Sequence, residues 1–312
     1  MARTLVTGGA GFIGSHIVDA LVDRGHGVLV IDNLVRGKRE NVNPAAELVE
    51  LDVRDERAAE LVRGFGPEVI FHHAAQMDVR KSVADPMYDA DVNILGIINL
   101  MEAATDAGTR QVVFASSGGA IYGEAGQVPT PETAPLNPES PYGVSKLCSE
   151  LYLGYYGRGK GMSCVSLRYA NVYGPRQDPY GEGGVVAIFT SRLLAAEPCC
   201  VFGDGEQTRD YTHVHDVVAA NLAAMEAAPE EPVCLNIGTG QETTVNELYA
   251  ELSAITGGRG ELRPEPARAG ELLRSALDGR RARAVLGWEP QIPLRDGLRE
   301  YVKYMAGQKG AA

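Results

Sequence analysis

A glycine-rich turn near the N-terminus constrains the fold of this chain more than any other feature of its sequence. Glycines stand at positions 8, 11 and 14, between a short apolar run at 4–7 and an amphipathic helical pattern at 12–23. Small residues let the backbone turn tightly there, and the start of a helix offers unpaired N–H groups to an anion such as a pyrophosphate. The spacing therefore predicts a strand, a phosphate-binding turn and a helix at the start of a dinucleotide-binding fold.

The alternation of strand and helix continues through the first half of the chain. Short β-branched runs predict strands at 4–7, 28–31, 47–51, 68–72, 111–115 and 163–168. Amphipathic patterns between them predict helices at 12–23, 56–65, 88–107 and 142–156. Continuous apolar strands joined by helices are typical of a parallel sheet that is covered on both faces. We expect an α/β fold, in which a Rossmann-type doubly wound parallel sheet carries a smaller C-terminal α/β substrate lobe.

The regular alternation ends after residue 168, where the sequence becomes rich in glycine and proline from 173 to 184. Later patterns predict helices at 186–196, 244–254 and 294–304, a strand at 233–237 and a frayed tail at 307–312. We expect a dinucleotide-binding Rossmann domain over 1–170. Residues 171–312 are expected to form mainly a smaller lobe, with some segments returning to the first domain.

Charge and cysteine content limit the classes of partner and the compartment. The 29 lysines and arginines against 41 acidic residues give a net charge of −12, which argues against broad binding of nucleic acid or anionic membrane. Any anionic ligand must therefore meet a local basic pocket. Five cysteines without a CxxC pair, and an N-terminus without a long apolar stretch, favour a cytoplasmic protein with free thiols.

The histidines do not predict a metal site. His72 and His73 are neighbours at the end of a strand and are expected to point to opposite faces. His213 and His215 lie two residues apart, and the sequence places no third convergent ligand beside them. We therefore expect no bound metal.

An acidic residue after the second predicted strand sharpens the interpretation of the glycine turn. Asp32 follows Gly14 by 18 residues, about where a carboxylate would hold the adenosine ribose hydroxyls. Such a carboxylate repels a 2′-phosphate and favours NAD over NADP, although the nearby Arg36, Lys38 and Arg39 offset part of its charge. The alternative is an ordinary glycine turn followed by a solvated aspartate.

Tyr142 and Lys146 form a YxxxK pair, one helical turn apart on the same face. An unperturbed tyrosine is a poor base at neutral pH, and an ammonium group one turn away, helped by the positive nicotinamide ring of the cofactor, is expected to lower its pKa. A second pair, Tyr156 and Lys160, has two glycines in its spacer, which indicates a helix end rather than a rigid face. We assign catalysis to the first pair and a structural role to the second.

Several ordered motifs together carry a family resemblance over essentially the whole chain. They are TGGAGFIG at 7–14, HHAAQ at 72–76, SSGGAIYG at 116–123, PYGVSK at 141–146, RYANVYGPRQ at 168–177, RDYTHVHD at 209–216 and LNIGTG at 235–240. In these motifs the chain resembles the extended short-chain dehydrogenase/reductase family, of the UDP-glucose 4-epimerase type. The resemblance implies a tightly held NAD that oxidises a nucleotide sugar at C4 and then returns the hydride to the other face of a 4-keto intermediate.

The resemblance also implies roles for individual residues. Tyr142 would be the general base at O4, with Lys146 as its electrostatic partner and Ser117 close by. The residues implied to line the cofactor are Gly8, Gly11, Phe12, Ile13, Gly14, Asp32, Asn33, Asp52, Val53, His73, Ala74, Ala75, Gln76, Asn93, Ser116, Tyr142, Lys146 and Tyr169. Those implied to contact the nucleotide sugar are Gly118, Tyr142, Asn171, Val185, Val201, Phe202, Arg209, Tyr211, Arg268, Glu271 and Ser275.

Some of these residues also fit a plain structural role. Asp52 is nearly as well placed to cap the end of a strand, and Asn93 to pack a helix. Val185 and Val201 fit ordinary core packing as well as a wall for the uracil and ribose.

One position departs from the family pattern. Many relatives carry a serine or threonine that relays a proton between the sugar and the tyrosine, and here that position is Gly118. We expect Tyr142 to contact O4 directly, because glycine leaves room for a closer approach; relay by Ser117 or by water is the alternative.

Gly119 and Ala120 stand where related dehydratases and decarboxylases carry acidic residues, so elimination chemistry lacks its acid.

The resemblance leaves substrate and assembly open in part. The small Ser275 stands where relatives gate the sugar C2 substituent, so N-acetyl sugars are expected to be accepted along with UDP-glucose. A homodimer is expected from the resemblance alone. The alternatives are an epimerase of another nucleotide sugar, such as a UDP-uronate or a dTDP-hexose, or a Rossmann protein that senses a dinucleotide without catalysis.

Overall fold

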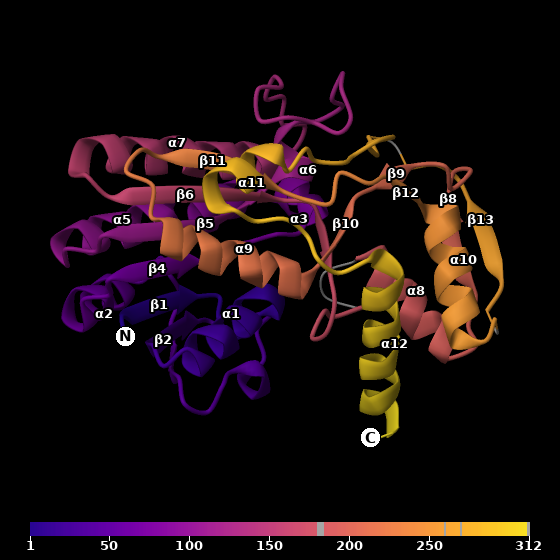
Figure 1. Ribbon diagram of the computed structural model, residues 1–312, viewed down its shortest axis with the longest axis horizontal. Coiled ribbons are helices and arrows are strands. Elements are labelled where there is room, and N and C mark those ends of the chain that lie inside the picture. The colour runs from indigo at the N-terminus through magenta and orange to yellow at the C-terminus, as the bar shows by residue number, and fades with distance from the viewer. Residues whose placement is uncertain (180–183, 259, 269, 311–312) are drawn as a thin grey trace.

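A seven-stranded parallel sheet forms the centre of the larger part of the protein (Figure 1). The computed structural model describes residues 1–179, 184–258, 260–268 and 270–310, so positions 180–183 of the Gly/Pro-rich segment lie outside the described residues. The strands stand in the order β11-β6-β5-β4-β1-β2-β3. Their bounds are β1 (Arg3–Thr7), β2 (Gly27–Asp32), β3 (Glu47–Glu50), β4 (Val69–His72), β5 (Gln111–Ser117), β6 (Ser163–Tyr169) and β11 (Val233–Ile237).

Helices cover both faces of this sheet, which is why its central strands are almost entirely buried. One face packs against α1 (Phe12–Asp23), α9 (Val214–Ala227) and α11 (Arg280–Leu286). The other face packs against α2 (Glu56–Phe65), α5 (Gly96–Asp106) and α7 (Pro141–Lys160). Each face has its own apolar core, and the predicted doubly wound α/β fold is confirmed.

The smaller lobe is built from helices and three short strand pairs (Figure 1). Its helices are α8 (Val185–Leu194), α10 (Val245–Thr256) and α12 (Leu294–Gly310). Its strand pairs are β8 (Cys199–Phe202) with β13 (Leu262–Glu265), β9 (Thr208–Arg209) with β12 (Thr243–Thr244), and β7 (Asn171–Tyr173) with β10 (Tyr211–His213). Phe189, Leu248 and Leu298 are among the buried residues of its separate core.

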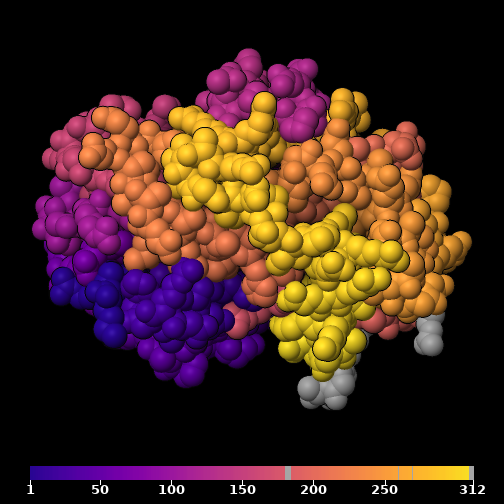
Figure 2. Space-filling view, viewed as in Figure 1, coloured from indigo at the N-terminus to yellow at the C-terminus, as the bar shows by residue number. Residues whose placement is uncertain are grey.

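The C-terminal part of the chain belongs to both parts of the molecule. Strand β11 pairs with β6 at the edge of the large sheet, and α9 and α11 pack on that sheet. Figure 2 shows the orange and yellow C-terminal segments spread over the larger part and the lobe on this face. The sheet and the lobe are therefore joined by several crossings of the chain rather than by one linker.

Several elements differ from the sequence expectation. The helix predicted over 88–107 is divided into α4 (Pro86–Ala90), a π-helical turn η2 (Asp91–Leu95) and α5. The frayed tail is a wrong prediction for residues 307–310, because α12 continues to Gly310. Short helices that no periodicity announced are α3 (Val79–Ala84), α6 (Gly118–Ile121) and the 3-10 turn η1 (Arg39–Asn41). Among the described residues, no helix combines the length and the apolar composition that crossing a bilayer requires.

Candidate active site

A single cavity opens at the carboxyl ends of the central strands, where β4 and β2 flank β1 and the chain order reverses across the sheet. This is the place where an open α/β sheet binds its ligand. Its lining includes every residue predicted for cofactor binding except Asn93. These residues are Gly8, Gly11, Phe12, Ile13, Gly14, Asp32, Asn33, Asp52, Val53, His73, Ala74, Ala75, Gln76, Ser116, Tyr142, Lys146 and Tyr169.

The glycine turn forms one wall of the cavity and tolerates no larger residue at two positions. Gly8 has φ +70°, and a Cβ atom there would lie 2.6 Å from the backbone nitrogen of Ala74. A Cβ on Gly14 would lie 2.3 Å from the carbonyl oxygen of Gly8. Helix α1 starts after Gly11 without a side-chain cap, so the N–H groups of its first turn remain available. A cradle of this kind fits a pyrophosphate.

Asp32 is held rigidly at the end of β2. One carboxylate oxygen accepts a hydrogen bond from the Ala10 amide at 3.0 Å, and the other accepts from the Leu34 amide at 2.8 Å. Burial raises the pKa of this carboxyl group. Each oxygen keeps a second lone pair for a ribose hydroxyl. Among the cations that follow, Arg36 lines the cavity, whereas Arg39 pairs with Glu50 at 2.8 Å.

Asp52 lines the same cavity as Asp32 and is paired with Arg54. The carboxylate accepts from the Arg54 Nε atom at 2.8 Å and from the Asn33 side-chain amide at 2.9 Å. The hydrogen bonds from Arg54, partly opposed by burial, hold the pKa of Asp52 at about 2. The carboxylate is therefore charged, and it fixes both the Arg54 side chain and the strand-end loop.

Asn93 lies behind the cavity wall and not in it. Its amide oxygen accepts from the Gln76 backbone at 2.9 Å, and its amide nitrogen donates to the Gln76 carbonyl at 2.8 Å and to Asp89 at 3.1 Å. The side-chain amide of Gln76 also donates to Asp89, at 2.8 Å. Contrary to the sequence expectation, the amide groups of Asn93 are committed to the loop after β4, and Asn93 positions Gln76 rather than contacting a cofactor.

Tyr142 and Lys146 reach the cavity from the first turns of α7. Pro141 occupies the first turn of that helix, and Ser140 caps it by accepting from the Gly143 amide at 3.2 Å. Lys146 is 4% exposed, and its ammonium group donates to the Ala115 carbonyl at 2.8 Å, 5.8 Å from the centre of the Tyr142 ring. The Ser117 hydroxyl makes a hydrogen bond with the Tyr142 phenol.

Burial shifts the pKa values of this pair. Burial raises the pKa of Tyr142 to about 12, partly opposed by the hydrogen bond with Ser117, and the charge of Asp89 raises it further. Burial lowers the pKa of Lys146 to about 8, against the opposing charges of Asp89 and Glu150. The expected lowering of the Tyr142 pKa involves the positive nicotinamide ring as well as Lys146, so for the loaded site it stays a prediction; in the ligand-free site burial outweighs the charge of the ammonium.

The space beside Gly118 is filled, which contradicts the expectation that glycine leaves room there for the sugar. A Cβ atom on Gly118 would lie 2.5 and 2.7 Å from the two methyl carbons of Leu277. Leu277 is 2% exposed, and its amide donates to Asp210 at 3.2 Å. Asp210 also accepts from Thr239 and Gly240, so a buried carboxylate ties the segment around Leu277 to the end of β11.

A buried polar network that the sequence analysis missed supports the strand carrying Ser116. The Ser116 hydroxyl donates to Glu150 at 2.6 Å, and Glu150 pairs with Arg168 at 2.7 Å. Arg168 donates to the Tyr122 hydroxyl at 2.7 Å, which in turn donates to Asn236 at 2.8 Å. Because these residues lie on separate elements, no local spacing identifies the network.

Lys81 and Tyr88 also line the cavity, and no sequence pattern predicted them. The Lys81 ammonium lies 4.3 Å from the centre of the Tyr88 ring. Both residues belong to the short helices α3 and α4, whose lengths are too small to give a periodic signal.

The residues predicted for the nucleotide sugar fall into three groups. Arg209 lies 3.6 Å from Glu271, and the Arg268 guanidinium lies over the Phe202 ring at 3.5 Å. Ser275 lies beside α6, with its hydroxyl oxygen 3.8 Å from the Cβ position of Gly119. The rest lie on the lobe: Asn171 on β7, Val185 at the start of α8, and Val201 and Tyr211, both 5% exposed, in the lobe core.

The second YxxxK pair lies away from the cavity. The Tyr156 hydroxyl donates to Glu102 of α5, and the Tyr156 ring is 2% exposed in the core on that face of the sheet. Helix α7 runs through both spacer glycines and ends at Lys160, capped by Gly161 in a left-handed conformation. This pair packs two helices together.

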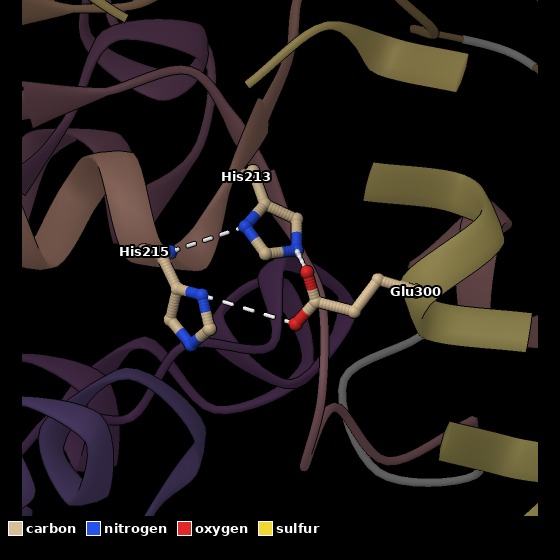
Figure 3. A group of neighbouring side chains, drawn as sticks. All are labelled: His213, His215 and Glu300. Atoms are coloured by element: carbon tan, nitrogen blue, oxygen red, sulfur yellow. Dashed lines mark hydrogen bonds and ion pairs between the residues drawn. The ribbon is translucent and has the colours of Figure 1, made fainter. Parts of the chain in front are cut away.

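A carboxylate group lies beside His213 and His215, for which the sequence predicted no third metal-binding group. Glu300 of α12 lies 3.9 Å from the Nε2 atom of His213 and 3.8 Å from the Nδ1 atom of His215 (Figure 3). The expectation that no third metal-binding group reaches them is therefore wrong. Glu300 lies far along the chain, on a helix whose packing the sequence pattern does not reveal.

Comparison with known proteins gives consistent findings. The family model described as "NAD dependent epimerase/dehydratase family" matches residues 4–238. The UDP-glucose 4-epimerase of Mycolicibacterium smegmatis is 48% identical, over 97% of this chain and 98% of that protein. The crystal structure of UDP-glucose 4-epimerase from Thermotoga maritima with UDP-glucose is similar at a TM-score of 0.96 and 50% identity, covering 98% and 99% of the chains. That of the Thermus thermophilus enzyme with NAD is similar at 0.91 and 45%, with the same coverage.

Proposed function

The chain belongs to the NAD dependent epimerase/dehydratase family, and we propose that within it the chain interconverts UDP-hexoses that differ at C4. It is an NAD-dependent 4-epimerase acting on UDP-glucose and UDP-galactose. The observation that carries this function is one continuous cavity, with the glycine turn and Asp32 at one end and Tyr142, Lys146 and Ser116 at the other. A dinucleotide bound along it ends beside an acid–base pair, which a protein that only senses the cofactor does not need.

The cofactor site is built for a dinucleotide without a 2′-phosphate. The first turn of α1 offers its amides to the pyrophosphate, and Asp32 accepts from the ribose hydroxyls. The same carboxylate repels a phosphate at the ribose 2′ position, and of the cations that follow it at positions 36, 38 and 39, only Arg36 lines the cavity. When bound, NAD supplies the oxidation and reduction of the sugar at C4.

Tyr142, Lys146 and Ser117 handle the proton on the sugar O4 atom. Tyr142 accepts this proton as the sugar is oxidised and returns it after the 4-keto sugar has turned over. A phenol with a pKa of about 12 is protonated at neutral pH and cannot accept a proton, so the positive charge of Lys146 and that of the oxidised cofactor must favour the phenolate when the site is loaded. Ser117 is already hydrogen-bonded to the phenol, and Leu277 fills the space at Gly118, so Ser117 carries the relay.

The same segment disfavours elimination and decarboxylation. Gly119 and Ala120 are the first residues of α6 after Gly118, and neither has a group that removes or donates a proton. Removing a C5 proton, or handling a carboxylate, demands an additional acid or base in this place. The sugar therefore returns from the 4-keto stage by reduction alone.

The lobe binds the nucleotide diphosphate sugar, with Arg209 and Arg268 as the cations for the phosphates. Phe202, Val185, Val201, Tyr211 and Asn171 shape the nucleotide side of this site. Ser275 lies against Gly119 with a small side chain, which leaves space for an N-acetyl group at C2. UDP-N-acetylglucosamine is therefore a second substrate.

A homodimer is supported by an exposed apolar face on neighbouring helices. Leu95 of η2 is 57% exposed, and Leu151 and Tyr155 of α7 are 66% and 56% exposed. Helices α5 and α7 and the turn η2 contact one another, so these side chains lie over a common surface that a second copy would cover.

The cysteines of the chain are free thiols in the structure, which supports a reducing, cytoplasmic location.

The proposed function is tested with purified protein and UDP-galactose. The wild type is expected to produce UDP-glucose, detected by the proton NMR signals of the anomeric position. Tyr142→Phe keeps the ring and the cavity and is expected to bind NAD normally, but to lose turnover by at least about 100-fold. If wild-type protein that carries NAD leaves both UDP-galactose and UDP-glucose unchanged, the proposed function is wrong.

A further inference from the structure

Two histidines and a glutamate that the proposed function does not use meet at the junction of α9 and α12 (Figure 3). His213 ends β10 and caps α9, His215 lies in the first turn of α9, and Glu300 lies on the inward side of α12. One ligand atom from each residue lies within 4.8 Å of the others. None of the three lines the cofactor cavity.

The buried nitrogen of this cluster has no hydrogen-bond partner among the described residues. His213 is 1% exposed, and its Nε2 atom is buried and unpaired while it points toward Glu300. The nearest carboxylate oxygen, at 3.9 Å, is too far for a hydrogen bond. Buried polar atoms in folded proteins are nearly always paired, so an unpaired one directed into a group of ligand atoms indicates a missing partner.

We propose that His213, His215 and Glu300 form a binding site for a transition-metal ion of the Zn²⁺ class. Two imidazole nitrogens and one carboxylate oxygen are a donor set that suits Zn²⁺ and Co²⁺. Mg²⁺ and Ca²⁺ prefer oxygen ligands alone and do not fit it. Three protein ligands leave the fourth tetrahedral position to a water molecule.

Side-chain movements of about an ångström would bring the three ligands to bonding distance. Ligands at about 2.1 Å from a tetrahedral Zn²⁺ lie about 3.4 Å from one another. The histidine nitrogens lie 3.9 and 3.8 Å from the two different oxygens of the Glu300 carboxylate, and one ligand atom from each residue lies within 4.8 Å of the others. The His215 and Glu300 side chains are 47% and 45% exposed, so both have room to make this shift. His213 is the fixed, buried ligand around which the other two close.

Metal binding also selects the tautomer of His213. The Nδ1 atom of His213 accepts from the His215 amide at 3.4 Å, the long limit of a hydrogen bond. Coordination through Nε2 requires the proton on Nδ1, so this long contact is lost and the His215 amide must turn away from the Nδ1–H group. His16 lies beside His215, with ring centres 5.3 Å apart, but its Nε2 atom is engaged with the Pro175 carbonyl at 2.9 Å. His16 is therefore a neighbour of the site and not a ligand.

The site would join the two parts of the molecule. Helix α9 packs on the large sheet, whereas α12 packs against α8 and α10 of the lobe. A metal ion held by both helices stabilises the folded state by mass action and fixes α12 against the sheet. Its expected effect is structural, so binding is measurable without any substrate.

The test uses untagged full-length protein, stripped with a chelator and then titrated with Zn²⁺ or Co²⁺. We expect one equivalent to bind, a visible Co²⁺ absorption spectrum typical of a low-coordinate site, and a rise in melting temperature of about 5 °C at a hundredfold excess over Kd. His215→Asn and Glu300→Gln change half-exposed side chains and should fold normally. Each should weaken binding at least about 100-fold.

Matched controls separate this site from adventitious binding. His26→Asn and Glu226→Gln remove a histidine and a carboxylate that lie outside the cluster, and both should bind metal like the wild type. The proposal is overturned if the wild type binds neither metal more tightly than about 100 µM, which would leave an ion-pair cluster. It is also overturned if His215→Asn and Glu300→Gln bind as tightly as the controls.

Discussion

Adding one methyl group at Gly118 should destabilise the protein through a single contact, which a second substitution can remove. In Gly118→Ala the new Cβ atom would lie 2.5 Å from a Leu277 methyl carbon, about 1 Å closer than a normal carbon contact. Leu277 cannot swing away, because it is 2% exposed and its backbone is held by Asp210. Overpacking of this kind costs about 1–3 kcal/mol of folding free energy.

For a chain of this size, that cost lowers the melting temperature by about 2–6 °C. Turnover of UDP-galactose should fall as well, because Gly118 follows Ser117 directly and a shift of α6 moves the hydroxyl away from Tyr142. The assay is a thermal melt and an initial-rate measurement on the same preparations. Gly126→Ala is the matched control, since a Cβ atom at Gly126 meets no atom within 4 Å.

A double mutant decides whether Leu277 is the cause. Leu277→Ala alone should cost about 2–5 kcal/mol by opening a cavity. In the Leu277→Ala background, the Gly118→Ala substitution should then cost almost no folding free energy, which gives a favourable coupling of about 1–3 kcal/mol. If Gly118→Ala is as stable as Gly126→Ala, or if its cost is unchanged in the Leu277→Ala background, the reasoning about this contact is refuted.

Three further predictions test the catalytic end of the cavity and its support. Ser117→Ala should reduce turnover about 100-fold with NAD content unchanged, measured by initial rate and absorbance; an unaltered rate would exclude the relay. The pKa of Lys146 falls from 10.5 to about 8 on folding, so the unfolded chain holds an extra proton between these values. Lys146 should therefore contribute a rise of about 2 kcal/mol in the free energy of unfolding of ligand-free protein from pH 8 to about pH 9.5; because buried thiols with raised pKa values titrate in the same range, the rise is measured as the difference between wild type and Lys146→Met in urea titrations. Glu150→Gln breaks the buried pair with Arg168 and should cost about 3–5 kcal/mol, whereas Glu50→Gln at a surface pair should cost under about 1 kcal/mol; equal costs would contradict the burial argument.

The sheet and the cofactor end of the cavity were predictable because their signals are local. An apolar run of four to seven residues indicates a buried strand, and the glycine spacing indicates a tight turn between a strand and a helix. Asp32 is the last residue of β2, so the topology alone brings it to the edge where Gly8 and Gly14 turn. These residues needed no knowledge of distant contacts.

The predictions that failed depend on partners far away in the sequence. Leu277 fills the space at Gly118, and the backbone of Gln76 hydrogen-bonds the side-chain amide of Asn93. Glu300 lies beside His213. Tertiary packing brings each of these partners into place. The raised pKa of Tyr142 in the ligand-free site could not be predicted for a similar reason, because burial depends on the whole fold. Motif spacing identifies a residue type at a position but not what packs against it.

The central claim is that the sugar is oxidised and reduced at C4 and is not otherwise altered. The most direct measurement follows UDP-galactose that carries deuterium at C4, incubated with the wild-type protein and NAD and analysed by NMR and mass spectrometry. The account predicts UDP-glucose that retains the deuterium at C4 and has the mass of its substrate. A product that has lost the deuterium, water or carbon dioxide, or the absence of any UDP-glucose, would contradict it.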